Sequence, residues 1–180
     1  IKPYIIQSRE HRGWSPEIIE EKSLGFAPPN RNELRKHLEE KGYNWREMMA
    51  TGLFSALTED GPPTALWCGR YVFPYYDAET KDPVYALFRT IDKDRGGWGS
   101  EDEKYNDWAG DQKYTKTKKN AEYAMMSEPI YGQESIVEGE PLLITEGMAD
   151  AISAHDNDIP CISPVTTKFK EDHFEILKDI

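Results

Sequence analysis

Two carboxylates in the stretch 141–152 have the residue types and the spacing of a metal site. Residues Leu142–Thr145 are typical of a short buried strand, and a helix pattern begins directly after Glu146 and Gly147. An acid at the carboxyl end of such a strand lies where α/β sheets place their ligands, and Asp150 follows one helical turn later. Gly147 lets the backbone turn sharply and keeps the space beside the carboxylate open. We therefore expect Glu146 and Asp150 to face one crevice and to suit Mg²⁺, a hard ion that takes oxygen ligands.

The same pattern has a second interpretation that needs no ligand. A strand, an acid, a glycine and a helix follow one another in many α/β proteins, where the acid only stabilises the N-terminus of the helix through its dipole. Short motifs of this kind also arise by chance. Both interpretations stay open on this stretch alone, so the rest of the chain has to decide between them.

Positively charged residues that could contact phosphates lie earlier in the chain. The segments 70–77 and 84–91 are rich in aromatic and β-branched residues and are joined by a polar turn. They predict a β-hairpin with Arg70 near the start of one strand and Arg89 near the end of the other. Residues 111–119 then contain four lysines and one acid, in a chain whose net charge is −11. This cluster favours a phosphate contact over a merely solvated loop. For the two arginines the alternative is ordinary surface residues beside a hairpin.

Several short helices and one further strand would position these residues. Ser15, Pro16 and Glu17 combine an N-cap serine, a proline at the first helical position and an acid in the first turn, so they predict a helix that Gly25 ends. The other elements expected are helices at 32–41, 45–51 and 168–178, a break at 26–30, a surface loop at 92–112 and a strand at 159–163.

The composition limits the class of protein and the kinds of site. The 180 residues are 38% hydrophobic and 31% charged, so we expect one compact domain or two small ones, soluble and globular. No apolar run approaches the roughly 20 residues that span a membrane. The net charge argues against a general basic coat for nucleic acids but leaves room for local contacts. Cys68 and Cys161 lie far apart with no CxxC or Cys/His cluster, so we expect no zinc site and a reduced, cytosolic state.

Four stretches, taken in chain order, resemble the catalytic core of bacterial-type (DnaG-like) DNA primases. They are residues 9–54, similar to the family's helix, RGLS turn and small helices; residues 69–91, similar to its R-V-x-F-P-I strand and the strand after it; residues 113–132, similar to its K-Y-x-N-S-P-E-T segment; and residues 141–177, similar to its TOPRIM segment, with EGMAD where the family has EGYMD. The resemblance covers almost the whole chain in the correct order.

This resemblance implies a fold and a function. The fold is α+β: a primase-type N-terminal subdomain of small helices and antiparallel strands, residues 1–135, joined to the first half of a TOPRIM α/β unit, residues 136–180. The function is template-directed synthesis of short RNA primers on single-stranded DNA during replication, by a nucleotidyltransferase that uses Mg²⁺ or Mn²⁺. Ribonucleoside triphosphates would be the substrates, a replicative helicase a further candidate partner, and the cytoplasm of a prokaryotic or viral system the location.

The resemblance also implies roles for particular residues. Glu146 matches the TOPRIM glutamate, a metal-site or acid–base residue, and Asp150 matches the acid four residues later. The residues expected to bind phosphates of template, primer or nucleotide are Arg70, Arg89, Lys113, Tyr114 and, from the same basic cluster, Lys116. Phosphoryl transfer mainly needs metals and cations placed around charge that is already on the phosphate, so these types agree with the chemistry.

The family pattern is incomplete in this chain. The family's Asp-x-Asp pair would follow the helix that ends near Ile180, so we expect a fragment with part of a metal site, inactive in primer synthesis by itself. The family's S-L-G-T turn becomes Ser163–Thr166 and loses its glycine. Two other functions stay open: another TOPRIM enzyme, such as a nuclease or topoisomerase, and a non-catalytic nucleic-acid-binding remnant.

Overall fold

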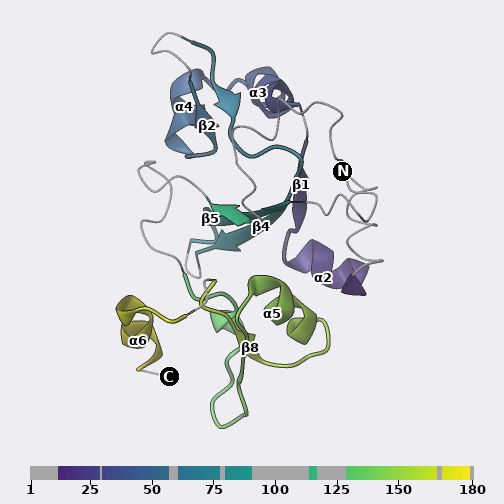
Figure 1. Ribbon diagram of the computed structural model, residues 1–180, viewed down its shortest axis with the longest axis vertical. Coiled ribbons are helices and arrows are strands. Elements are labelled where there is room, and N and C mark those ends of the chain that lie inside the picture. The colour runs from purple at the N-terminus through teal and green to yellow at the C-terminus, as the bar shows by residue number, and fades with distance from the viewer. Residues whose placement is uncertain are drawn as a thin grey trace. The chain divides into compact units, whose positions relative to one another are not determined.

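The computed structural model describes residues 12–28, 30–56, 61–77, 80–90, 114–116, 129–165 and 168–178 (Figure 1). The chain divides into two compact units, each made of segments that are distant in sequence. Unit 1 comprises Ile1–Leu24, Tyr75–Pro83 and Ser127–Ile180, and unit 2 comprises Gly25–Pro74 and Val84–Met126. The predicted boundary between residues 135 and 136 stays a prediction, because the compact units follow a different division.

Unit 2 contains a small helical layer over a strand pair. Helices α3 (Arg31–Glu40) and α4 (Trp45–Ala50) lie beside strands β2 (Phe54–Ser55) and β3 (Thr64–Ala65), which pair antiparallel. Asn44 caps α4 in a capping box with Glu47, which satisfies backbone groups at both positions. The core consists of Met48, Phe54 and Ala65, and the partly buried Leu34, Leu38, Met49, Leu53 and Cys68 pack against it. The predicted helices at 32–41 and 45–51 are confirmed.

A four-stranded sheet has the order β1-β4-β5-β6, with β1 Gly25–Ala27, β4 Arg70–Tyr76, β5 Pro83–Thr90 and β6 Tyr114–Lys116. β1 pairs antiparallel with β4, and β6 pairs antiparallel with β5. The predicted hairpin is confirmed: β4 and β5 are neighbours, and the Asp77 N–H donates to the Asp82 carbonyl at 2.9 Å where they meet.

The segment around Gly25 differs from the sequence expectation. Helix α2 (Pro16–Glu21) ends four residues before this glycine, because Ser23 takes a left-handed φ of 49° and closes the turn. Gly25 instead starts β1, and the other two residues of β1 lie in the stretch 26–30 that was predicted as a break. A strand of three residues has little periodicity of its own, and hydrogen bonds to β4 define it.

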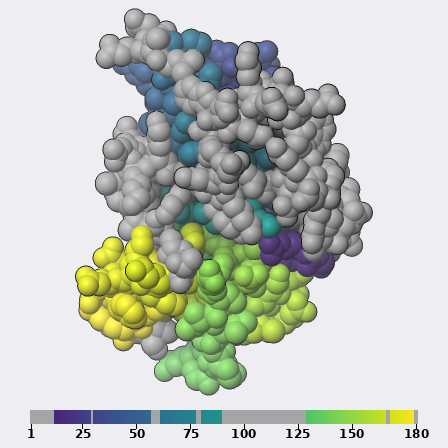
Figure 2. All heavy atoms as spheres, in the orientation of Figure 1, coloured from purple at the N-terminus to yellow at the C-terminus, as the bar shows by residue number. Residues whose placement is uncertain are grey.

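Unit 1 is built around helix α5 (Met148–His155) and the parallel pair β7 (Leu143–Ile144) and β8 (Cys161–Ile162). It also holds α2, the 3-10 turn η3 (Gln133–Ser135) and α6 (Glu171–Leu177). Figure 2 shows the purple spheres of α2 against the green of α5. The buried apolar residues of this unit are Trp14, Ile18, Ile19, Ile130, Tyr131, Met148, Ala149, Ala151, Ile152, Ala154, Cys161 and Ile162.

The predicted buried strand Leu142–Thr145 is corrected in both length and burial. β7 contains only Leu143 and Ile144, whose exposed fractions are 44% and 56%, whereas their partners Cys161 and Ile162 in β8 are 0% and 1% exposed. In the described chain, β7 is hydrogen-bonded on one edge only, and the helix α5 packs on β8. Apolar composition alone could not distinguish the covered strand from the uncovered one.

The predicted α+β class is confirmed by this mixture of short helices and antiparallel strands. Along the parts of the chain that the structure describes, no helix combines the length and the apolar character needed to cross a membrane.

Candidate functional site

Glu146 lies at the junction between β7 and α5, at the position that the sequence predicts. The strand-to-helix backbone is fixed on both sides of it: the Thr145 N–H donates to the Ile162 carbonyl at 3.0 Å, and the Ser163 hydroxyl donates to the Glu146 carbonyl at 3.2 Å. The side chain of Glu146 is exposed. A carboxylate on a fixed backbone and open to solvent can meet a ligand without first leaving another partner.

Asp150 lies in the first turn of α5, and its side chain is 65% exposed. Its Oδ1 atom is 3.7 Å from Nη1 of Arg12, a loose ion pair rather than a hydrogen bond. Its Oδ2 atom lies on the side of Gly147, 3.5 Å from the point where a Cβ on that glycine would be. Asp150 therefore uses one carboxylate oxygen in the ion pair and presents the other toward the start of the helix.

Gly147 is the N-cap of α5, but its conformation is not one that needs glycine. Its φ of −122° and ψ of 147° are ordinary extended backbone. The expectation that a sharp turn requires glycine is therefore wrong at this position. The expectation of open space is confirmed among the described residues: there a Cβ would touch only the Asp150 carboxylate, at an ordinary contact distance of 3.5 Å.

The two acidic side chains suit a hard divalent ion that takes few of its ligands from the protein. Glu146 and Asp150 offer carboxylate oxygens, and Mg²⁺ is commonly held by one or two carboxylates together with substrate phosphates and waters. Within the described residues no group of three or more His, Cys, Asp or Glu side chains gathers to hold a metal. The donor set fits the two-carboxylate arrangement and not an all-protein cage.

The predicted cationic residues belong to unit 2, and the two predicted acids belong to unit 1. Arg89, near the end of β5, is opposite Tyr114 in the β5–β6 register, and Leu87 is opposite Lys116. The backbone register thus brings Tyr114 and Lys116 alongside the end of the strand that carries Arg89. Lys113 and the predicted loop at 92–112 lie outside the described residues.

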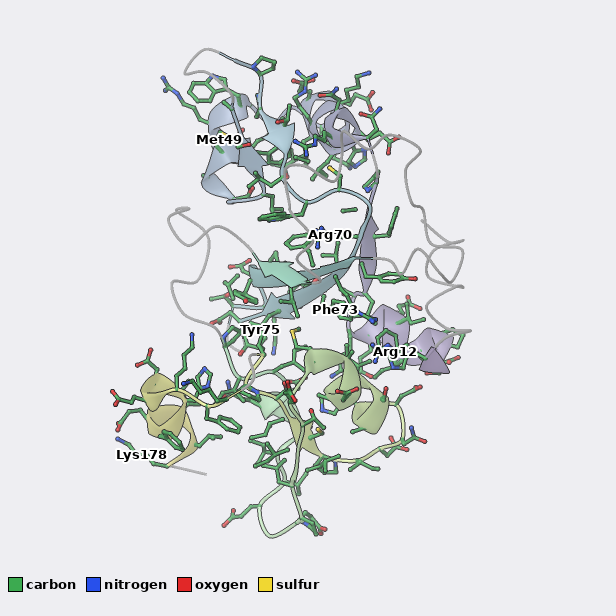
Figure 3. All side chains as sticks on the ribbon, viewed as in Figure 1. Arg12, Met49, Arg70, Phe73, Tyr75 and Lys178 are labelled. Atoms are coloured by element: carbon green, nitrogen blue, oxygen red, sulfur yellow. The ribbon has the colours of Figure 1, made fainter. Side chains whose placement is uncertain are left out.

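Arg70 begins β4 and is 4% exposed, which is unusual for a side chain expected to meet a phosphate (Figure 3). Burial lowers the pKa of the Arg70 guanidinium, and the charge of Cys68 acts against that shift. Burial also raises the pKa of the Cys68 thiol to about 11, although the charges of Arg31 and Arg70 oppose the rise. In this arrangement Arg70 contributes to the interior beside β1, and its expected role at a phosphate stays a prediction.

Residues 12–15 contact the acidic site and were not among the candidates from sequence. Arg12 pairs with Asp150, Trp14 Nε1 donates to the Ser153 hydroxyl at 2.8 Å, and the Ser15 N–H donates to Asp156 at 2.9 Å. These partners are more than 130 residues apart in the chain. Periodicity and capping rules act over a few residues, so they could not predict these contacts. The only sequence signal for them was the arginine and tryptophan of the RGWS turn.

Comparison with known proteins gives the family and the fold. The sequence model of the DNA primase catalytic core, N-terminal domain, matches residues 5–124. A DNA primase of Chlamydia pneumoniae is 22% identical over 182 residues, covering 98% of this chain. The RNA polymerase domain of Mycobacterium tuberculosis primase DnaG is 22% identical with a TM-score of 0.75, covering 97% of this chain. A DnaG primase catalytic domain bound to single-stranded DNA is 21% identical with a TM-score of 0.68, covering 97%.

The chain spans only part of these relatives. It covers 27% of the length of the Chlamydia primase, 53% of the Mycobacterium chain and 50% of the chain solved with single-stranded DNA. At these identities the likeness to solved structures shows the fold.

Proposed function

The chain belongs to the DNA primase catalytic core family, and from this premise we propose that the protein carrying it synthesises short RNA primers on single-stranded DNA. The match of the family's N-terminal core to residues 5–124, followed in the chain by the strand–Glu146–helix unit, carries this proposal. Of the three functions that the sequence left open, primer synthesis accounts for both parts. A nuclease or topoisomerase would account for the acids and leave residues 5–124 unexplained.

In this proposal Glu146 and Asp150 hold Mg²⁺ or Mn²⁺, with Glu146 as a ligand or as the base that accepts the proton of the attacking hydroxyl. Their exposure and the free side of the Asp150 carboxylate support this role. A divalent ion held there would offset negative charge on the transferring phosphoryl group. Residues 136–180 would form the N-terminal part of a TOPRIM domain, after a primase-type subdomain of residues 1–135.

Arg70, Arg89, Lys113, Tyr114 and Lys116 would bind phosphates of the template, the primer or ribonucleoside triphosphates. The register that sets Tyr114 opposite Arg89 supports a shared location for these two positions. The complex of a related catalytic domain with single-stranded DNA supports such a template for this protein. A cytoplasmic location and a replicative helicase as partner complete the proposal.

Primer synthesis by the natural protein that carries this chain tests the proposal. The assay uses a single-stranded template and labelled ribonucleotides, and compares wild type with Glu146→Gln. Glu138→Gln, an exposed acid of the same unit, is the matched control. We expect template-dependent RNA from wild type and the control, and a loss of at least about 100-fold in the Glu146 variant, in the range typical of removing an acid–base group. Cleavage or relaxation of DNA without RNA synthesis would favour a different TOPRIM enzyme. Inactivity of wild type in all of these assays would favour a binding remnant.

A further inference from the structure

One face of α5 is contacted by the segment 12–15, at three positions spaced by three residues. Asp150, Ser153 and Asp156 lie at this spacing, so they follow one side of the helix and its C-terminal end. Trp14 donates a hydrogen bond to Ser153, and Ser15 donates one to Asp156. Arg12 forms the ion pair with Asp150. The segment therefore fixes a positive charge at the end of the helix that carries Asp150.

The guanidinium of Arg12 is held in place more firmly than an exposed surface arginine. It lies 5.6 Å from the centre of the Trp14 ring, and Trp14 is itself 2% exposed. The side chain of Arg12 is 26% exposed, against 65% for that of Asp150. The face of an aromatic ring attracts a cation, so the contact with the buried Trp14 favours this position of the guanidinium.

The geometry of the pair leaves Asp150 able to bind while Arg12 stands beside it. The 3.7 Å separation involves Oδ1 alone, and Oδ2 is directed to the side of Gly147. Any ion held by Asp150 would lie within a few ångströms of a fixed positive charge. At that range a positive charge repels a bare divalent cation and attracts a metal–triphosphate complex, whose net charge is negative.

We propose that Arg12 is a selectivity residue of the site at Asp150: it disfavours free divalent cations and favours the metal–triphosphate complex. This inference rests on the proposed function, because it takes Asp150 to be part of the metal site. A purely structural role for Arg12 predicts a different pattern, since loosening α5 would weaken both ligands together. The two ligands must respond in opposite directions if charge is the cause.

Binding measurements on the natural protein that carries this chain test the inference without requiring catalysis. The loss of the free Mn²⁺ signal in electron paramagnetic resonance gives the affinity for Mn²⁺ alone. The affinity for the Mn²⁺ complex of a non-hydrolysable ribonucleoside triphosphate is measured separately. For Arg12→Gln we expect Mn²⁺ alone to bind about three- to tenfold more tightly and the complex to bind more weakly by a similar factor, for one charge acting across partly exposed solvent.

Two further variants separate the effect of the Arg12 charge from the effect of its shape and from the effect of removing any arginine. Arg12→Lys keeps the charge and should retain the wild-type order of affinities, with the fold checked by thermal unfolding. Arg46→Gln is the matched control, because Arg46 also lies over a tryptophan, 5.4 Å from the Trp45 ring, but at an exposed position of α4 in unit 2. It should change neither affinity.

The outcomes distinguish this inference from the proposed metal site. If Glu146→Gln and Asp150→Asn weaken Mn²⁺ binding while Arg12→Gln weakens both ligands or changes neither, the selectivity role is overturned and the site stands. If the two acidic variants leave Mn²⁺ binding unchanged, the metal site and the selectivity role are overturned together. The inference is established if Arg12→Gln changes the two affinities in opposite directions and Arg12→Lys has the affinities of wild type.

Discussion

The ammonium group of Lys22 joins two segments of unit 1 that lie over a hundred residues apart. Its Nζ is 2.9 Å from Glu134 and 3.0 Å from Glu21, and its side chain is 11% exposed. Burial alone would lower the pKa of Lys22, but its hydrogen bonds and the charges of the two acids raise it. Burial alone would raise the pKa of Glu134, but the hydrogen bond and charge of Lys22 lower it. Both shifts favour the charged pair.

These shifts predict how the pair contributes to stability across pH. A lowered carboxyl pKa contributes stability that is complete above the ordinary value of 4.5 and is lost as the pH falls through the folded value. A raised ammonium pKa contributes stability that is complete below the ordinary value of 10.5. That stability is lost as the pH rises through the folded value. Because the Glu134 side chain is 59% exposed, we expect Glu134→Gln to cost only about 0.5–1 kcal/mol at pH 7. Urea unfolding of both proteins should show the difference shrinking at pH 3. A difference that grows on acidification would contradict the assignment.

Single-residue features were predictable from sequence where the partner is local. The Ser15 side chain accepts the Ile18 N–H at 3.1 Å, as its N-cap position predicts. The same hydroxyl also donates to Asp156, a contact that no local rule contains. Glu146 lies at a strand–helix junction that follows from its neighbours in the chain, whereas the contact of Arg12 with Asp150 follows from the fold and was not predicted.

Among the elements, the turn at Gly132 shows a true requirement for glycine. Its φ is +83°, and a Cβ there would lie 2.2 Å from the Cys161 carbonyl oxygen and 2.9 Å from the His155 ring. The His155 Nε2 atom is 2.8 Å from that same oxygen, so the ring cannot move aside without losing this contact. Gly132 thereby lets η3 approach β8 closely.

Replacing Gly132 by alanine should destabilise unit 1 strongly. We expect a cost of about 2–4 kcal/mol, the sum of a left-handed alanine and an overpacked backbone contact. Gly139→Ala is the matched control, because Gly139 has a φ of +81° and no described atom lies within 4 Å of the added Cβ. It should cost only about 1 kcal/mol for the backbone conformation. Thermal or urea unfolding measures both, and equal costs would show that the close approach to β8 is unimportant.

Elements with their own end signals or a long strand pattern were predicted, whereas the short strand β1 was not. Helix α2 begins where its N-cap Ser15 predicts, and α3 and α4 begin within one residue of the predicted starts at 32 and 45. The sequence predicts a helix end at Gly25 and a break at 26–30, because β1 becomes a strand only by pairing with β4. The predicted helix at 168–178 is confirmed in shortened form as Glu171–Leu177.

For the whole molecule, the exposed apolar edge of the parallel strand pair is the feature that the sequence analysis predicted wrongly. The sequence predicts β7 to be buried, and it is exposed. Ile144 and Ile162 are partners in register, and they are 56% and 1% exposed. Within the described residues β7 is paired on one edge only, and an exposed apolar edge strand promotes association between chains. We therefore expect Ile144→Lys in the 180-residue chain to change the free energy of unfolding by no more than about 0.5 kcal/mol and to reduce self-association. Ile162→Lys, the same change on the covered strand, should cost about 4 kcal/mol or more because it buries a charge. Sedimentation velocity and urea unfolding measure the two effects, and self-association undiminished in the Ile144 variant would exclude this edge as its cause.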